Sequence, residues 1–147
     1  MRTLITGLIC AFLAGCGGAE TGPEEAVRAW VQAAEAAAEE KDRQGLLELI
    51  AENYADSRGN DHAQIGNMIR FYFLRQKSVA FLTSINDIVV MGDTAAQVSL
   101  TVGMAGTDAS ALGVRADAYN FELELEKMDD EWLLIGARWG AVGREMR

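Results

Sequence analysis

Residues 116–128, Ala-Asp-Ala-Tyr-Asn-Phe-Glu-Leu-Glu-Leu-Glu-Lys-Met, carry the pattern that decides the fold. Side chains of successive residues in a strand point to opposite faces of the sheet. The alternation therefore predicts a long strand with one face in the core and one acidic face in solvent. The apolar positions are Tyr119, Phe121, Leu123 and Leu125, and the polar positions are Asn120, Glu122, Glu124 and Glu126.

Three further strands are predicted around this stretch. Gly92-Asp93 is a hairpin signal, Asp129-Asp130 indicates a second turn, and residues 105–113 indicate a small, polar loop. Consecutive strands joined by such short connections predict an antiparallel sheet. The predicted strands span residues 79–91, 94–104, 116–128 and 131–141.

Upstream of the sheet, apolar residues recur with the period of helices. Residues 21–24, Thr-Gly-Pro-Glu, have the spacing of a capping box and predict the start of a first helix. Asp42 is placed to cap a second helix that fades at residues 53–54, and residues 61–64 have the spacing of a cap for a third. Helices followed by strands favour an α+β domain with three helices on one face of an antiparallel sheet.

The first 15 residues have the features of a secretory signal. Arg2 supplies a positive charge, and the apolar run at residues 4–13 is shorter than the roughly 20 residues of a membrane span. Leu13-Ala14-Gly15-Cys16 resembles the bacterial lipobox, in which the cysteine thiol is acylated and becomes the new N-terminus. Alternatively, Cys16 is only a small residue in an ordinary signal.

The lipobox resemblance implies a domain organisation and a location. Residues 1–15 would be a signal peptide, residues 16–22 the lipidated cysteine with a short linker, and residues 23–147 the folded domain. In bacterial lipoproteins, Asp after the cysteine tends to retain the protein at the inner membrane. Gly17 stands there in this chain, so the resemblance implies a lipid anchor at the periplasmic face of the outer membrane.

Composition excludes several classes of function. Without residues 1–15 the chain has 22 Asp and Glu against 12 Lys and Arg, and this acidic balance argues against binding nucleic acid. Cys10 would leave with the signal and Cys16 would carry lipid, so no thiol remains for a disulfide, metal or nucleophile. With one His, and residues 56–61 departing from the calcium-loop pattern, we expect no metal and no cofactor.

The order of elements resembles the nuclear-transport-factor-2-like superfamily, whose members form a cystatin-like cone. Residues 129–139, Asp-Asp-Glu-Trp-Leu-Leu-Ile-Gly-Ala-Arg-Trp, resemble the terminal strand of many members. Residues 54–59, Tyr-Ala-Asp-Ser-Arg-Gly, are similar to a Tyr-x-Asp-x-x-Gly motif of some bacterial members. The resemblance covers residues 24–142 and implies a pocket between the helices and a curved sheet. It does not specify activity, because the superfamily holds isomerases, cyclases, dehydratases and non-catalytic domains.

The polar and aromatic candidates for this pocket are Tyr54, Tyr72, Asp117, Tyr119 and Arg138. Asp117 shares its face of the predicted strand with Tyr119, so it is expected on the apolar side, where a carboxyl group has a raised pKa unless it is paired. Two alternatives stay open: Asp117 lies at the open rim in water, or it pairs with Arg115 or Arg138. Tyr72 and Tyr119 also suit a simple core role.

Two functions remain. The first is a lipid-anchored domain that binds a small apolar ligand or an envelope protein, without catalytic residues. The second is an isomerase, cyclase or dehydratase-like enzyme with Asp117 as base and Tyr72 or Tyr119 as donor. A single His and the lack of a second acid on an apolar face favour the first. The glutamates of residues 122–126 argue against a homodimer through that strand, and the oligomeric state stays open.

Overall fold

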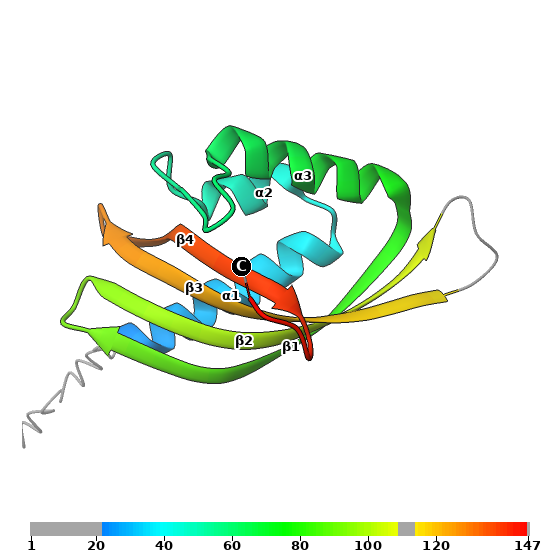
Figure 1. Cartoon of the computed structure of the whole chain (residues 1–147). Coiled ribbons are helices and arrows are strands. Elements are labelled where there is room, and N and C mark those ends of the chain that lie inside the picture. The colour runs from blue at the N-terminus through cyan, green and yellow to red at the C-terminus, as the bar shows by residue number, and fades with distance from the viewer. Residues whose placement is uncertain (1–21, 109–113, 147) are drawn as a thin grey trace, which may run out of the picture.

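The computed structural model describes residues 22–108 and 114–146. The predicted signal segment and Cys16 lie outside these ranges, as do residues 109–113 of the predicted loop. Three helices precede four strands, as the sequence predicts (Figure 1). The elements are α1 (Pro23–Glu39), α2 (Arg43–Glu48), α3 (His62–Arg75), β1 (Gln76–Met91), β2 (Ala95–Asp108), β3 (Val114–Met128) and β4 (Glu131–Ala141).

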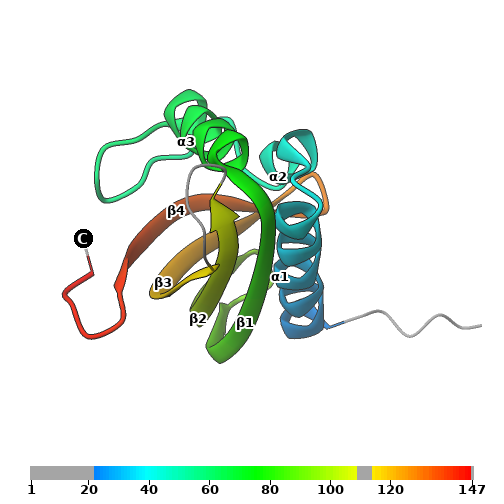
Figure 2. The same cartoon turned by 90° about the vertical axis from the view of Figure 1, so that its right-hand side faces the viewer.

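The strands form one antiparallel sheet in the order β1-β2-β3-β4. The sheet is strongly curved, with α1 along one side and α3 above it (Figure 2). Register shifts at Ile85/Asp87 in β1 and at Glu124/Leu125 in β3 mark irregularities of the kind that bend a sheet. The predicted α+β class and curved four-stranded sheet are confirmed.

The core lies between α1 and the face of the sheet that the helices cover, here called the inner face. Val27 and Trp30 of α1 are buried in one cluster with Val98 of β2 and Leu125 of β3. The Trp30 indole Nε1–H donates to the carbonyl of Leu49 at 3.3 Å. The alternation in β3 is as predicted, because Leu123 and Leu125 are buried while Glu124 and Glu126 are exposed on the outer face.

The second helix is shorter than predicted, because the chain after it pairs with the edge of the sheet. α2 ends at Glu48, whereas the sequence pattern carried it to residues 53–54. The N–H of Leu134 in β4 donates to the carbonyl of Leu49, and the N–H of Ala51 donates back to the carbonyl of Leu134, both at 3.0 Å. These bonds replace helical ones and cover part of the β4 edge.

Strand limits also differ from the predictions. β1 starts at Gln76, directly after α3, and β2 runs to Asp108, so residues 105–108 belong to a strand and not to the predicted loop. Small residues in this segment have low strand propensity, but pairing between β1 and β2 continues to Gln76 and Asp108 and overrides it. β4 has the predicted limits of 131–141.

The predicted helix caps are confirmed at two of three positions. The Asp42 carboxylate accepts the Gly45 N–H at 2.9 Å, and Asp61 and Gln64 form a full capping box at 2.8 Å in each direction. The predicted capping box at residues 21–24 is wrong, because the N-cap of α1 is Gly22, which has no side chain to accept a hydrogen bond. Within residues 22–108 and 114–146, none of the helices has the length and apolarity needed to cross a membrane.

Candidate ligand-binding site

A cavity of about 510 Å³ lies between α3 and the inner face of the sheet. Its volume falls in the range of about 300–1,000 Å³ that is typical of small-molecule sites. All three helices and all four strands contribute to its lining, so it belongs to the fold as a whole. The described residues that line it are Ala38, Leu46, Tyr54, Arg58, Ile65, Met68, Ile69, Tyr72, Phe73, Phe81, Met104, Tyr119, Phe121, Leu123, Leu134, Ala137 and Trp139.

Sequence periodicity explains how α3 and β3 present these side chains. Ile65, Ile69, Tyr72 and Phe73 recur at helical spacing and form the face of α3 that lines the cavity. From β3, alternate residues 119, 121 and 123 reach the same space. The predicted stripe of the third helix and the predicted alternation therefore meet across one cavity.

Aromatic rings dominate one part of the lining. The Tyr72 and Phe81 ring centroids are 6.5 Å apart, and the Phe121 and Trp139 rings stack at 6.4 Å with an angle of 21°. The Tyr72 hydroxyl points to the Met104 sulfur at 3.8 Å, and a thioether is a weak acceptor. Burial raises the pKa of Tyr72, and the nearby Asp117 and Tyr119 raise it further. Tyr72 therefore stays a neutral hydroxyl at this wall.

The segment from Tyr54 to Asn60 forms a turn around one carboxylate. Asp56 accepts the Tyr54 hydroxyl at 3.3 Å, the Arg58 N–H at 2.9 Å, and the backbone and side-chain N–H groups of Asn60 at 2.9 and 2.8 Å. Gly59 adopts φ +81° there, a conformation that glycine tolerates best. Asp56 is thus a turn residue, and the Tyr-x-Asp-x-x-Gly motif is a structural element of the cavity wall.

Two pKa shifts follow from this turn. Burial alone would raise the pKa of Asp56, but the hydrogen bonds from Asn60, Arg58 and Tyr54 outweigh burial and lower it. Burial, together with the charge of Asp56 and the hydrogen bond to it, raises the pKa of Tyr54 far above the ordinary tyrosine value. The pair is therefore fixed as a neutral phenol donating to a carboxylate.

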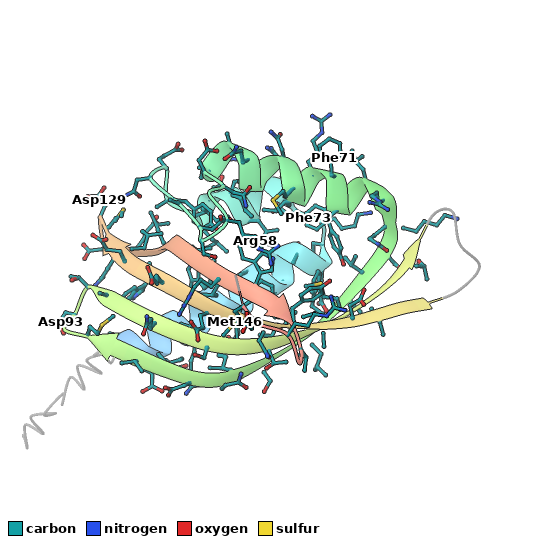
Figure 3. The ribbon with its side chains drawn as sticks, in the orientation of Figure 1. Arg58, Phe71, Phe73, Asp93, Asp129 and Met146 are labelled. Atoms are coloured by element: carbon teal, nitrogen blue, oxygen red, sulfur yellow. The ribbon has the colours of Figure 1, made fainter. Side chains whose placement is uncertain are left out.

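Arg58 is a lining residue that sequence reasoning did not find. Its guanidinium carbon lies 4.4 Å from the Trp139 ring centroid, and its Nη2–H donates to the Trp139 carbonyl at 3.0 Å. Arg58 is exposed, and in the view of Figure 3 it lies between α3 and the sheet. Its position inside the Tyr-x-Asp-x-x-Gly segment is the signal that could have indicated it.

The structure brings together three of the five predicted pocket residues. Tyr54, Tyr72 and Tyr119 line the cavity. Asp117 does not: it lies opposite Met104 in the sheet and is exposed, as in the alternative that placed it at a rim in water. Its charge still acts on Tyr72.

Arg138 lies on the outer face, away from the cavity. It pairs with Glu122 across β3 and β4 and lines a separate hollow of about 270 Å³. The register shift opposite Glu124/Leu125 inserts Ile135 as an extra residue between Leu134 and Gly136. This bulge inverts the alternation after Leu134, so Ala137 turns inward and Arg138 outward.

The chemistry of the cavity is that of an apolar binding site. Its described lining includes three phenols and one guanidinium, but no carboxylate and no imidazole. Over residues 22–108 and 114–146, no group of three or more His, Cys, Asp and Glu side chains could hold a metal ion. The groups present can orient a ligand by hydrogen bonding and stacking.

Comparison with known proteins identifies the fold. No protein-family model and no curated protein sequence matches this chain. A provisionally assigned scytalone dehydratase from Novosphingobium aromaticivorans superposes with TM-score 0.75 at 12% identity, covering 83% of this chain and 94% of that one. A provisionally assigned dehydratase of the NTF2-like family from Streptomyces avermitilis gives 0.70 at 14%, covering 83% and 97%.

A ketosteroid isomerase-like protein from Erwinia carotovora atroseptica is also similar, with TM-score 0.67 at 13% identity, covering 81% of this chain and 95% of that one. At such identities the similarity concerns the fold alone. The chain has the nuclear-transport-factor-2-like fold, as the resemblance in sequence led us to expect. Proteins with this fold include those named as dehydratases and isomerases.

Proposed function

We propose that this protein is a lipid-anchored domain of the bacterial envelope that binds a small apolar ligand without catalysing a reaction. The observation that carries the proposal is the 510 Å³ cavity, whose described lining is apolar and aromatic and offers no general base. Seven aromatic residues face it, so a ligand with rings or a compact apolar body suits it best.

Catalysis of the isomerase or dehydratase kind is the alternative, because solved structures with the same fold carry such names. Those reactions need a base within hydrogen-bond reach of a bound substrate. The charge of Asp117 acts on Tyr72, but Asp117 is exposed and outside the lining. The arrangement therefore supports binding better than proton abstraction.

Ligand binding is tested with a neutral apolar fluorophore, N-phenyl-1-naphthylamine, titrated into the purified domain. Ala38 of α1 lines the cavity, whereas Ala33 of the same helix is exposed. We expect Ala38→Phe to fill the cavity and weaken binding by about tenfold or more, and Ala33→Phe to leave it unchanged. Equal affinity of the two variants, or no binding by the wild type, would refute the proposal.

The anchor is tested separately, by intact mass and membrane fractionation of the wild type beside Cys16→Ser. We expect the wild type to gain the mass of acyl chains and to sediment with membranes, because two or more chains anchor a protein stably. The serine variant should be unmodified and soluble. An unmodified, soluble wild type would remove the anchor while leaving the cavity result intact.

A further inference from the structure

α3 has an apolar ridge on its outer side, facing away from the cavity. Phe71 and Leu74 are one helical turn apart and keep 66% and 69% of their surface exposed. Phe73, between them in sequence, is buried on the cavity side. Figure 3 shows Phe71 above the helix and Phe73 beneath it. Two large apolar side chains this exposed on one ridge indicate a contact surface.

The segment that carries this ridge has basic but no acidic side chains, unlike the chain as a whole. From His62 to Asn86 there is no Asp or Glu, although the formal net charge of the chain is −9. Helical geometry places Arg70 on one flank of the ridge and Arg75 on the other, and both are exposed. We call Arg70, Phe71, Leu74 and Arg75 the α3 ridge. A partner surface that complements the α3 ridge is apolar and is rimmed by carboxylates.

The position of the ridge argues against the anchoring membrane as its partner. α1 begins at the end of the molecule opposite α3 (Figures 1 and 2). α1 has 17 residues and is therefore about 25 Å long. A linker of residues 17–22 reaches about 20 Å when fully extended. This is less than the length of α1, so with α1 upright on the bilayer that holds Cys16 the ridge stays away from the lipid.

We propose that the α3 ridge is the docking surface for an envelope protein that presents an apolar groove with an acidic rim. The proposal goes beyond ligand binding and rests on the lipid anchor of the proposed function for its orientation. In that orientation the ridge faces away from the bilayer, where a partner protein can reach it.

The test is site-specific photocrosslinking in cells that express the full chain. A benzophenone amino acid replaces Phe71, or Leu82 as the control, since Leu82 is even more exposed at 78% but lies on β1, outside the ridge. We expect one protein adduct from position 71 and none from position 82. No adduct at position 71 above the control overturns the proposal. Fractionation of the same cells reports on the anchor independently.

The crosslinked protein is then purified and titrated with the purified domain. We expect Arg70→Glu to weaken binding by about tenfold or more, with the wild-type affinity falling as salt rises. Arg144→Glu, at an exposed position beyond β4, should have no comparable effect. Equal affinities of the two variants, or no salt dependence, would overturn the proposal.

Other occupants of the ridge give different results. Flotation of the domain with phosphatidylglycerol vesicles that Phe71→Ser abolishes would assign the ridge to lipid. Sedimentation of the purified domain as a dimer that becomes monomeric in Phe71→Ser would assign it to a second copy. Either result would overturn the partner assignment. Because Phe71 is exposed, Phe71→Ser should unfold at nearly the same urea concentration as the wild type.

Discussion

At the scale of single residues, Asp56 holds one side of the cavity wall in place through hydrogen bonds. Its carboxylate collects four hydrogen bonds, from Tyr54, from Arg58 and twice from Asn60. Tyr54 and Arg58 both line the cavity, so the shape of one side of the site depends on this acceptor. A residue outside the lining thus positions two residues within it.

We predict that Asp56→Ala lowers the free energy of unfolding by about 1–3 kcal/mol near neutral pH, because several donors lose a charged acceptor. The pKa of Asp56 is lower in the folded state than in the unfolded state. Its stabilising effect is therefore present above the unfolded pKa of about 4 and disappears as pH falls through the folded pKa.

Urea unfolding of the wild type and of Asp56→Ala at pH 7, 5 and 3 measures this effect. The difference between them should be largest at pH 7 and shrink toward pH 3. Asp87→Ala, on an exposed strand position, is the control and should show little difference at any pH. A difference for Asp56→Ala that does not vary with pH would contradict the assignment.

At the scale of elements, periodicity predicted which segments are helices and strands, but not where the pattern is interrupted. The β4 strand has the predicted limits, yet its bulge at Ile135 inverts the faces of everything after it. Arg138 was therefore predicted on the wrong face. The bulge at Ile135 is set by pairing with β3, and no residue within β4 predicts it.

The other differences have the same origin in tertiary contacts. α2 stops early because Leu49 and Ala51 bond to β4, and β2 runs long because β1 pairs with its end. Of the candidate site, Tyr72 and Tyr119 could be predicted because apolar spacing identifies inward-facing positions. Tyr54 could be predicted because it begins the Tyr-x-Asp-x-x-Gly segment. Arg58 was not predicted, because its place depends on the turn that Asp56 organises, and its position inside the Tyr-x-Asp-x-x-Gly segment was the one signal for it.

We predict that the cap of α3 is an independent source of stability. Asp61→Ala removes the acceptor for the Gln64 N–H and should lower the free energy of unfolding by about 1 kcal/mol. Gln64→Ala removes only the return bond to the Asp61 N–H and should cost less. Urea unfolding of both variants tests this order, and equal or reversed losses would argue against the capping box.

At the scale of the whole molecule, one core holds the sheet to α1. Leu125 is almost fully buried in this core, and Leu82 is an exposed residue of the same type on β1. We predict that Leu125→Ala lowers the free energy of unfolding by about 2–5 kcal/mol. Leu82→Ala should change it by no more than about 0.5 kcal/mol.

Both losses are measured by urea unfolding, followed in parallel by tryptophan fluorescence and circular dichroism. Trp30 and Trp132 belong to the same core cluster as Leu125, so the two signals should change together in a single transition. Separate transitions would mean that α3 and the cavity wall unfold independently of the core.

The direct junction of α3 with β1 restricts how a ligand can reach the cavity. α3 ends at Arg75 and β1 begins at Gln76, and the Lys41 ammonium donates to the Gln76 carbonyl at 2.7 Å. Moving this end of the helix would break strand pairing, whereas the opposite end follows the turn at residues 56–60 and is joined to α2, where the Arg43 Nε–H donates to the Gly66 carbonyl at 3.0 Å. The α3 wall is therefore continuous with the sheet only at its C-terminal end. Access should begin at the first turn of α3, where amide hydrogen exchange would be faster than at its last turn.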